Sequence, residues 1–573
     1  MKKEKKFFDK NSEIYSVIII ICVIAFSFLL MGTIKAIVGE EDEISDVEIS
    51  NNKAEEYFYE KDYDKAINEY QKLQVDEEWP SYSVKIAEIY SLEGNVEESN
   101  RILEDVVVKR YSLFDTEGRE KYEDKDAELC NSIITNFLLN TNYKTALEYG
   151  EMFLSEVNDK QLSRTMFTVY MANGLKDKAK KIVETYNIDT ASAYDLATLA
   201  NMEMVIGEWD AGFEFLRKAW YIDKDEIKIF DVIAQVTSEN KNEIIKRITK
   251  LSNDTPDEIC YKVWLAKCYS MYEETAEDAS EIIYQLEGQE VGDVIFNTIK
   301  AKVYQNLGKN KEAEKIYNKI IKSDDSFVGY HTAAWYYLEM GDYEKALKYC
   351  KNSILLKKDY PDNYAFLIPE IMLKLNNSLQ AEPYFRTALN KEPFNYNIIL
   401  KTADFYWNVA KNSEKAYEYF NLASLILPND EDIFYNMALI KLTEEDNNKA
   451  IELVKKCIDI EETTAKYHRT LGTIYLSNGK NEEAIKQIRE AYAIDKKDIL
   501  TLNNAGCYYI SVEANLNRAL INFKAAYEGI TAETDSVTKD IITENYEKIK
   551  EISEKYENYD GASITLPNFE LFY

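Results

Sequence analysis

The feature that most constrains this chain is a three-residue pattern that recurs at a nearly constant interval. It consists of an alanine, a large apolar residue four positions later, and a small or apolar residue three positions beyond that. In the C-terminal half its copies are Ala313/Tyr317/Ile320, Ala346/Cys350/Ser353, Ala381/Phe385/Ala388, Ala416/Phe420/Ala423, Ala450/Val454/Cys457, Ala484/Ile488/Ala491 and Ala519/Phe523/Ala526. The alanines are 33, 35, 35, 34, 34 and 35 residues apart. A period near 34 predicts a stacked repeat array rather than one globular core.

Each repeat is predicted to be a pair of helices. Positions i, i+4 and i+7 lie on one side of an α-helix, and a small first residue lets a second helix approach closely. A second marker, mostly tyrosine, precedes each alanine by 9 or 10 residues, at Tyr304, Tyr337, Met372, Tyr406, Lys441, Tyr475 and Tyr509. Glycine turns at Gly308, Gly341 and Gly479 separate the two halves. Pro393 and Pro428 fall where the second helix is expected to end.

The pattern resembles the tetratricopeptide repeat family, whose L-G-x2-Y…A-x3-F…P signature is matched by Leu471-Gly472, Tyr475, Ala484 and Ile488. Weaker copies continue towards the N-terminus, at Ala66/Tyr70/Leu73, Ser99/Leu103/Val106, Ala146/Gly150/Phe153, Ala179/Val183/Tyr186, Gly212/Leu216/Ala219 and Ala279/Ile283/Leu286. One further unit is expected on Ile244, Ile248 and Leu251. The polar stretch 116–126 is expected to supply about 13 residues beyond the usual period. The resemblance implies an all-α, right-handed α-solenoid of about 14 helical hairpins over residues 51–530.

The end of the chain is predicted to close the array. Residues 531–558 read as a capping helix, which such an array needs because its last repeat would otherwise expose a stacking surface. The tail, residues 559–573, contains Phe569, Leu571, Phe572 and Tyr573. It is too short for a domain, so it either frays or folds back onto an apolar surface of the array.

Residues 14–38 are predicted to form a transmembrane helix. The eighteen residues from Ile14 to Met31 carry no charge, enough for about 27 Å of helix. A basic segment, residues 1–13, precedes it and an acidic linker, residues 39–50, follows it. The positive-inside rule then predicts a single-pass membrane protein with its N-terminus in the cytoplasm and an extracytoplasmic array, as in a bacterial cell envelope. A cleaved signal peptide is the alternative, and it would place the array in the same compartment.

The formal net charge of −33, from 102 acidic and 69 basic residues, restricts the kinds of partner. An acidic chain repels nucleic acid and anionic membrane surfaces, so we expect neither as a ligand. The charge either keeps a large array solvated or favours a protein partner with a basic surface.

No catalytic, cofactor or metal site is expected. The two histidines, His331 and His468, are far apart in the sequence, and no Ser-His-Asp set, paired histidine motif or glycine-rich phosphate loop occurs. Cys22 lies in the predicted membrane span. The remaining cysteines, at 130, 260, 268, 350, 457 and 507, include no C-x-x-C pair and are expected to be buried free thiols.

The resemblance implies that the first helix of each repeat lines a concave surface. Carried over, the residues of this partner-binding groove are His331, Trp335, Phe366, Asp404, Trp407 and Tyr435. Aromatic rings at these positions suit a partner peptide, but packing against neighbouring first helices or against the tail is the preferred interpretation. A subset of the family grips C-terminal carboxylates. Arg469 and Asn504 fit that clamp, but Thr473 stands where asparagine is required, so the clamp is not expected here.

We therefore expect a membrane-anchored interaction scaffold that uses an extracytoplasmic superhelix to bind partner proteins or peptides. A second hypothesis of the same general class is an anchored import or sorting receptor whose array faces the cytoplasm. Two hypotheses of different classes are an enzyme hidden within the repeats and a purely mechanical spacer. The partner and the oligomeric state stay open.

Overall fold

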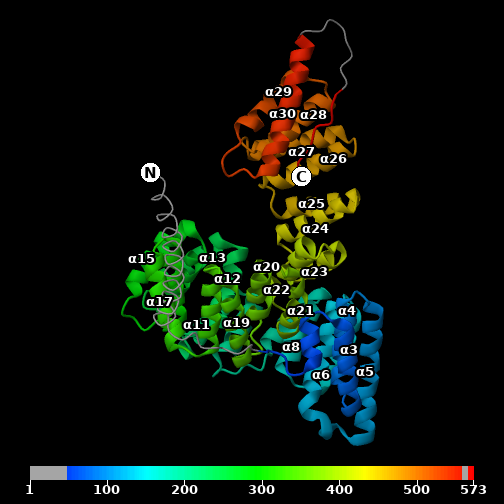
Figure 1. Ribbon diagram of the computed structural model, residues 1–573, viewed down its shortest axis with the longest axis vertical. Coiled ribbons are helices and arrows are strands. Elements are labelled where there is room, and N and C mark those ends of the chain that lie inside the picture. Colours follow the sequence, from blue (N-terminus) through cyan, green and yellow to red (C-terminus); the bar gives the residue numbers. More distant parts are fainter. Residues whose placement is uncertain (1–47, 558–565) are drawn as a thin grey trace, which may run out of the picture. The chain divides into compact units, whose positions relative to one another are not determined.

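The computed structural model describes residues 48–557 and 566–573, and all of its described helices lie within Ser50–Tyr573. In this described part the chain forms 29 α-helices and no strand (Figure 1). The prediction of an all-α solenoid is confirmed, because α2–α29 pair in chain order into fourteen hairpins, each of which contacts the next.

The first seven hairpins include the unit expected on Ile244 and Ile248, both of which are buried on α13. These hairpins are α2 (Lys53–Tyr59) with α3 (Tyr63–Asp76), α4 (Ser81–Leu92) with α5 (Val96–Glu117), α6 (Glu123–Leu139) with α7 (Tyr143–Glu156), α8 (Lys160–Ala172) with α9 (Lys176–Glu184), α10 (Ala193–Val205) with α11 (Trp209–Ile222), α12 (Ile227–Glu239) with α13 (Lys241–Asp254), and α14 (Ile259–Ser270) with α15 (Ala276–Leu286).

The next seven hairpins are α16 (Val294–Asn306) with α17 (Asn310–Ser323), α18 (Phe327–Glu339) with α19 (Tyr343–Leu356), α20 (Ile368–Lys374) with α21 (Glu382–Lys391), α22 (Tyr396–Asp404) with α23 (Ser413–Ile426), α24 (Glu431–Thr443) with α25 (Asn447–Ile460), α26 (Ala465–Ser477) with α27 (Asn481–Ile494), and α28 (Ile499–Ser511) with α29 (Leu516–Glu528). After them comes α30 (Ser536–Glu557), which contacts α29 and buries Ile542 and Ile549.

The turn inside a hairpin depends on one residue in the left-handed conformation. Twelve of the fourteen hairpins have such a residue. The predicted turn glycines are confirmed, with φ of +71° at Gly308, +79° at Gly341 and +71° at Gly479. Six hairpins use a residue other than glycine, at positions Lys61, Thr141, Asn376, Lys411, Glu445 and Ala514. The left-handed region is costly for residues other than glycine, so a sequence search for such turns looks for glycine. These six turns contain none at that position and could not be recognised in this way.

The extra residues expected near 116–126 are built into helices. They lengthen α5 to 22 residues and α6 to 17, with a 3-10 turn (Arg119–Tyr122) between them. The guanidinium of Arg110, which is fully buried, donates to both carboxylate oxygens of Asp126 at 2.5 and 2.7 Å and to Glu156 at 2.9 Å. This paired charge explains why polar residues here are part of packed helices.

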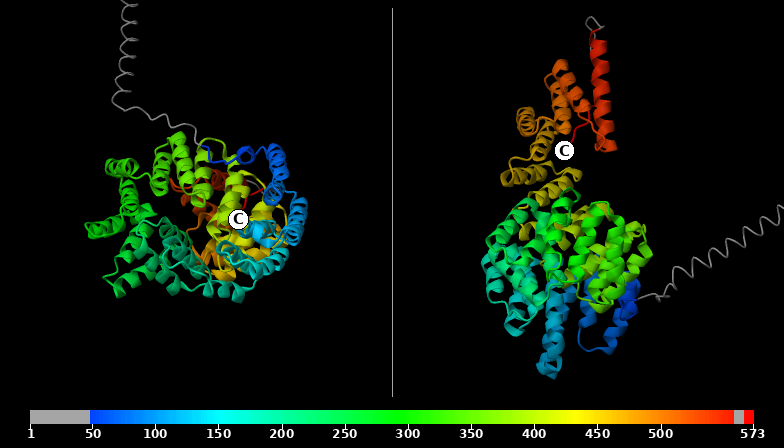
Figure 2. Two further views of the ribbon diagram at one scale, coloured as in Figure 1. Left: turned by 90° about the horizontal axis from the view of Figure 1, so that it is seen from below. Right: turned by 90° about the vertical axis from the view of Figure 1, so that its left-hand side faces the viewer.

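The first helices of successive hairpins form an inner row. Contacts join α4 to α6, α6 to α8, α10 to α12, and onward through α14, α16 and α18. The first helices of hairpins one to six all reach one helix from far along the chain, α21, and the residue that follows it. Figure 1 shows α21 beside α4, α6 and α8, and the left view of Figure 2 shows the yellow-green helices on the inner side of the blue-to-teal hairpins. The row therefore holds α21 as a groove would hold a ligand helix.

Buried polar contacts hold α21 in this position. Glu382 pairs with Lys61 at 2.6 Å, and Tyr384 stacks on Tyr59 with ring centroids 4.7 Å apart. Further contacts are Asn390 to Glu88 at 2.8 Å, Arg386 to Asn136 at 2.5 Å, Gln161 to the main-chain oxygen of Lys391 at 2.6 Å, Tyr194 to Glu392 at 3.1 Å, and Lys228 to Glu392 at 2.5 Å. Every first helix from α2 to α12 thus contributes one side chain.

Two π-helical turns mark the hairpins that contain and follow α21. They are Asn363–Leu367, directly before α20, and Phe405–Val409, directly after α22. Pro369 lies in the first turn of α20 and lacks the N–H that a regular helix would use there. A π-turn absorbs such a residue by shifting the hydrogen-bond register.

The predicted localisation is corrected by the described helices. Within residues 48–557 and 566–573, no helix is both long and apolar enough to cross a membrane. The longest, α5 and α30 with 22 residues each, carry charged residues along their length because only one side of a solenoid helix is buried. The predicted span, residues 14–38, lies outside the described residues. The placement of a single-pass protein with an extracytoplasmic array is therefore withdrawn.

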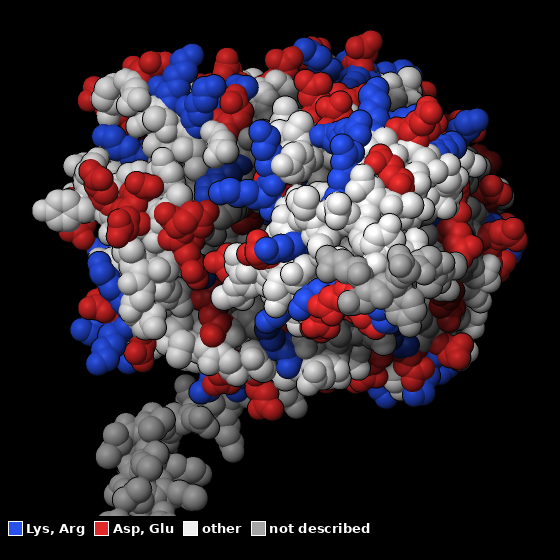
Figure 3. All heavy atoms as spheres, turned by 90° about the horizontal axis from the view of Figure 1, so that it is seen from above, with Lys and Arg blue, Asp and Glu red and all other residues white. Residues whose placement is uncertain are grey.

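Charge is distributed rather than gathered on the surface that Figure 3 shows. Lysine and arginine side chains lie among aspartate and glutamate there, with uncharged surface between them. The net charge of −33 is therefore not concentrated in one acidic patch on this face.

The buried pair between Lys228 and Glu392 gives a test of the contact between α21 and the inner row. Both side chains are 2% exposed. Replacing Lys228 with methionine leaves a buried carboxylate without its cation, so we expect the free energy of unfolding to fall by about 3–5 kcal/mol. Adding Glu392→Gln should recover part of this loss, because the uncompensated charge is removed.

Urea denaturation followed by circular dichroism measures the change. The control is Lys449→Met, which removes an exposed pair with Glu452 and should cost less than about 1 kcal/mol. Equal effects of the two methionine variants would contradict a structural role for the buried pair.

Candidate peptide-binding groove

The inner face of the last two hairpins holds an extended segment of the same chain. Residues 566–573 lie against α26, α28 and α30. The main chain of Glu570 is bound on both sides: its N–H donates to Asn545 Oδ1 at 3.1 Å, and its carbonyl accepts from Asn545 at 2.8 Å and Asn503 at 2.9 Å. One asparagine side chain therefore makes the paired contact that a neighbouring β-strand would make.

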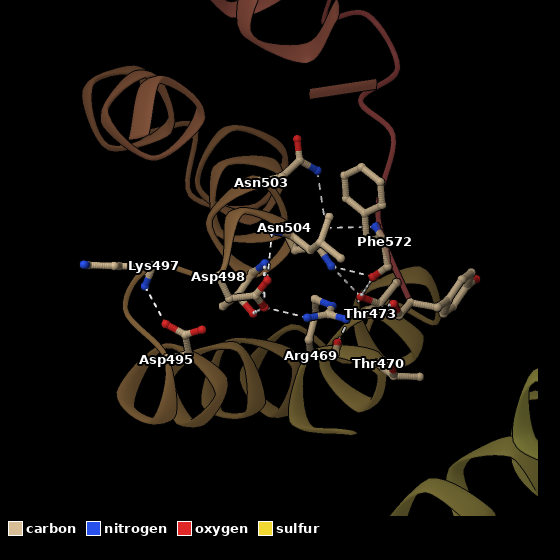
Figure 4. Close-up of polar contacts among 12 residues, drawn as sticks. Arg469, Thr470, Thr473, Asp495, Lys497, Asp498, Asn503, Asn504 and Phe572 are labelled. Carbon is tan, nitrogen blue, oxygen red and sulfur yellow. Dashed lines mark hydrogen bonds and ion pairs between the residues drawn. The ribbon is translucent and has the colours of Figure 1, made fainter. Parts of the chain in front are cut away.

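The main chain of Phe572 is bound in the same manner. Its N–H donates to Asn504 Oδ1 at 2.9 Å, and its carbonyl accepts from Asn504 at 2.6 Å and from the Thr473 hydroxyl at 2.7 Å (Figure 4). Arg469 donates to the main-chain oxygen of Tyr573 at 3.4 Å. Its guanidinium also pairs with Asp498 at 2.5 Å, which fixes its direction.

The three asparagines of the groove lie on α28 and α30. Asn503, Asn504 and Asn545 are each fully buried. Each amide offers a donor and an acceptor, and a buried amide that loses its partners costs free energy. The groove is therefore built to bind the main chain of an extended segment, whatever the side chains of that segment are.

Apolar pockets beside these asparagines receive side chains of the segment. Phe569, which is 7% exposed, stacks on Phe523 with ring centroids 5.3 Å apart. Leu571 packs against the same cluster, and Phe572 packs against a second cluster that contains Leu502 and Ile542. The side chain of Glu570 points to solvent. Side-chain selectivity of this groove therefore depends on the first, third and fourth positions of the sequence 569–572.

The sequence alone did not predict a binding site at this groove. Arg469, Thr473 and Asn504 are the positions of the carboxylate clamp that was not expected, because Thr473 replaces an asparagine. The structure brings all three together, and the threonine hydroxyl donates to Phe572. Asn503 and Asn545 were missed. The signal that could have found them is a polar residue at a buried position of an otherwise apolar helix face, which needs a partner.

A cavity lies elsewhere along the inner row. It has a volume of about 310 Å³ and is lined by residues of α12, α14, α16 and α18, including Asp231, Lys267, His331 and Trp335, and by Asp362, which directly precedes the π-turn Asn363–Leu367. A second cavity of about 250 Å³ shares Asp231, Trp335 and Asp362 and adds Phe366. Of the predicted groove residues, His331, Trp335 and Phe366 are therefore brought together here.

The three remaining predicted groove residues line neither cavity. Tyr435 contacts the Thr470 hydroxyl at 3.1 Å and packs on Tyr467, so its ring packs between neighbouring repeats instead. Asp404 and Trp407 are half-buried at the π-turn after α22. Burial raises the pKa of Asp404 above its ordinary value.

The histidine of the cavity is held in one neutral form. Its Nε2 accepts from the Trp335 indole at 3.1 Å, so the proton is on Nδ1, which lies 2.8 Å from Asn363 Oδ1. Desolvation by the surrounding protein lowers the pKa of His331, which agrees with a neutral ring. His331 therefore positions Trp335 in the cavity wall.

Two carboxyl groups in the cavity wall have a pKa above the ordinary value of aspartate. Desolvation, together with the nearby Asp362, raises the pKa of Asp231 above its ordinary value, and the Tyr360 hydroxyl donates to it at 3.1 Å. Desolvation likewise raises the pKa of Asp362. Desolvation lowers the pKa of Lys267, which lines the same cavity. Charges at this site are held in a poorly solvated wall.

The six cysteines in the described residues are buried and free, as expected. Cys260 and Cys268 share α14. Burial raises the pKa of these thiols, for example that of Cys268 to about 11. They pack as small apolar side chains rather than as reactive groups.

Ionisation at Asp231 gives a test by pH. The folded chain keeps the Asp231 proton to higher pH than the unfolded chain, so stability falls as pH rises above the ordinary aspartate pKa of about 3.9. Asp231→Asn removes this ionisation and keeps an acceptor for Tyr360. We expect this variant to be more stable than the parent at pH 8, by on the order of 1 kcal/mol, and equal to it below pH 4.

Thermal unfolding at a series of pH values measures this difference. Asp540→Asn, at an exposed position of α30, is the matched control and should shift the midpoint little at any pH. A gain for Asp231→Asn that is the same at pH 4 and pH 8 would show that ionisation is not its cause.

Hydrogen exchange tests the bound segment. In the variant Asn504→Ala, the Phe572 N–H loses its hydrogen-bond acceptor and the Phe572 carbonyl loses one of its donors. We therefore expect the Phe572 amide hydrogen to exchange at least about fivefold faster than in the parent. Amides in the middle of α26 serve as internal controls. Unchanged protection at Phe572 would mean that Asn504 does not hold the segment.

The comparisons with known proteins agree with the hairpins that the structure shows. Residues 296–327, 329–360, 431–464 and 465–498 match the tetratricopeptide repeat. The BBSome complex member BBS4 of Bos taurus is 22% identical over 275 residues, which is 47% of this chain and 50% of that protein, so this chain spans about half the length of the curated relative it matches.

Among solved structures, Naa15/Naa10 bound to HypK-THB is 12% identical, with 89% of this chain and 97% of that chain covered and a TM-score of 0.39. The APC/C hetero-tetramer Cut9-Hcn1 is 13% identical, with 86% and 95% covered and a TM-score of 0.35. At these scores neither indicates what this chain binds.

The four segments 296–327, 329–360, 431–464 and 465–498 coincide with α16–α17, α18–α19, α24–α25 and α26–α27, and these four hairpins are tetratricopeptide repeats.

Proposed function

We propose that this chain is a protein-interaction scaffold and that the groove formed by α26, α28 and α30 binds an extended segment of a partner protein. The observation that carries the proposal is the double pairing of Asn545 with Glu570 and of Asn504 with Phe572. Buried asparagines that pair with both main-chain groups of alternate residues fit an extended peptide. The proposed activity is recognition, with no bond made or broken.

Affinity and selectivity come from different parts of the groove. The asparagines and Thr473 bind main-chain groups that every peptide has. The pocket around Phe523 selects an aromatic ring, because a ring that fills a desolvated pocket contributes most of the binding energy at such interfaces. A partner is therefore recognised by a short stretch of sequence rather than by a folded surface.

A role in holding proteins together has independent support. The tetratricopeptide repeat is a protein-binding repeat in general, and the similar protein of Bos taurus is a member of a complex. The formal net charge of −33 favours partner proteins with basic surfaces over nucleic acid. The first six hairpins contribute to a scaffold as a rigid body, since their inner row is filled by α21.

The wall around Trp335 is a second surface proposed for partner contact. Trp335 and Phe366 line the cavities described above, and a half-buried ring in an open cavity can still accept an apolar side chain. Asp404, Trp407 and Tyr435 line neither cavity, so their part in binding a partner stays a separate prediction. Trp335→Ala is expected to weaken capture of a partner that uses the wall around Trp335, and Trp407→Ala to weaken capture of a partner whose groove extends to Trp407, while both variants keep the fold intact.

Selection of peptides tests the proposal for the groove. A random peptide library displayed on phage is selected on an immobilised parent chain that carries Phe569→Ala and Phe572→Ala, because these changes weaken the chain's own segment in the groove. Each enriched peptide is then tested against two groove variants of this parent, with Asn504→Ala or Asn545→Ala added. We expect binding to each variant to weaken by at least about tenfold, because two or more main-chain hydrogen bonds are lost.

The matched control is Asn522→Ala on the outer helix α29, whose amide donates to the main-chain oxygen of Arg518 in the same helix. Peptides that bind the parent and this control alike, and lose affinity for the two groove variants, support the proposal. Enriched peptides that bind Asn504→Ala and Asn545→Ala as well as the parent would contradict it.

A further inference from the structure

We infer that residues 566–573 act as a built-in competitor for the groove, and that the partner segment which displaces them repeats their pattern of an aromatic side chain followed by apolar side chains two and three positions later. This inference rests on the proposed function of the groove. It adds both the chemistry of the partner segment and the step that controls access to the groove.

The segment occupies the whole recognition surface described above. The main chain of Glu570 is hydrogen-bonded to Asn545, and that of Phe572 is hydrogen-bonded to Asn504. The ring of Phe569 fills the pocket at Phe523. Lys548 also donates to the main-chain oxygen of Asn568 at 3.0 Å. A partner peptide therefore cannot make these contacts until the segment leaves.

Contacts at the ends of the segment are weaker than those at its centre. Leu566 is 42% exposed and Tyr573 is 44% exposed. The contacts with the three buried asparagines and with the apolar pockets lie within the four residues from Phe569 to Phe572. Outside these four, Asn568 accepts from Lys548, and Tyr573 accepts from Arg469 at 3.4 Å. A partner needs only an equivalent stretch of four residues to compete, which sets the predicted pattern as aromatic, any residue, apolar, aromatic or large apolar.

An empty groove is unfavourable, so the segment is expected to be replaced by a partner peptide rather than simply to leave. Without an occupant, the buried amides of Asn503, Asn504 and Asn545 would lose main-chain partners and an apolar pocket would face water. The segment is connected to α30 through only eight residues, 558–565. A short covalent connection gives an effective concentration of the order of 1 mM, so a free peptide competes at a disadvantage.

The size of this disadvantage follows from mass action. The apparent affinity of a partner is reduced by the fraction of chains whose groove is open. If the free segment bound with a Kd of about 0.1 mM, a connection at about 1 mM would keep the groove about 90% occupied and weaken competitors about tenfold.

Binding of a labelled peptide to the full chain tests the inference. The probe is a fluorescent synthetic peptide with the sequence of residues 566–573, followed by anisotropy. The tail variant is the full chain with Phe569→Ala and Phe572→Ala, which weakens the internal segment and leaves the groove intact. We expect the tail variant to bind the probe at least about tenfold more tightly than the parent, and the addition of Asn504→Ala to remove most of that gain.

Two controls make the comparison specific. Leu566→Ala changes an exposed residue of the same segment and should leave the affinity of the full chain for the probe unchanged. A probe with Phe569→Ala should bind every chain more weakly, since it cannot fill the pocket at Phe523. Circular dichroism checks that the tail variant keeps its helices.

The outcomes separate this inference from the proposed function. Equal affinity of the parent and the tail variant would overturn the competitor while leaving a peptide-binding groove. Failure of the probe to bind any variant would overturn both. Light scattering that gives a dimer mass for the parent and a monomer mass for the tail variant would place the segment in the groove of a second copy and overturn competition within one chain.

A second measurement needs no substitution. Excess unlabelled peptide added to the full chain is expected to speed hydrogen exchange at the Glu570 and Phe572 amides of the chain, because both lose their asparagine acceptors when the segment is displaced. Binding of the peptide with no change at these two amides would overturn displacement.

Discussion

Buried charge at α21 is the constraint on which the N-terminal two thirds of the array depend. Glu382, Arg386 and Glu392 are all at least nine-tenths buried, and each has a partner on a first helix of the inner row or beside one. Burial alone would raise the pKa of Glu392, but the Lys228 ammonium holds it below its ordinary value. A buried charge is tolerated only when its partner is in place. The inner row of first helices must therefore pack around α21 with these partners aligned.

This closure decides where recognition can take place. A solenoid offers a concave surface along its whole length, yet here hairpins one to six use theirs to hold α21. The two surfaces proposed for a partner, the cavity wall at Trp335 and the groove of the last two hairpins, are not the surface that holds α21. The two grooves also differ in kind. The first holds a helix through side-chain charges, whereas the second holds an extended segment through its main chain.

The difference between the two occupants is physical. The helix α21 satisfies its own main chain and offers only side chains, so it needs matched charges and rings, and it is fixed between two neighbouring hairpins. The segment 566–573 leaves its main chain unpaired, so buried asparagines can hold it, and few side chains anchor it. An occupant with few anchors exchanges more readily than one with many, which is why the C-terminal groove is the better candidate for a regulated binding site.

The sequence by itself determined the repeating hairpin, because alanine spacing, turn glycines and helix-ending prolines are local signals. It predicted the number of units, the unit on Ile244 and Ile248, and the free buried cysteines. It could not locate turns such as those at Lys61 and Ala514, where the chain adopts the left-handed conformation without glycine.

Only the tertiary structure decided which surfaces are free. Lys228 and Glu392 are 164 residues apart, and no periodic pattern links them. The same holds for Asn504 and Phe572, and for Thr473, whose hydroxyl replaces the amide that the family resemblance required. The periodic pattern specifies how each hairpin packs on the next. Contacts between distant hairpins depend instead on the curvature of the whole stack. Because small differences at every interface add up to that curvature, only the tertiary structure shows these contacts.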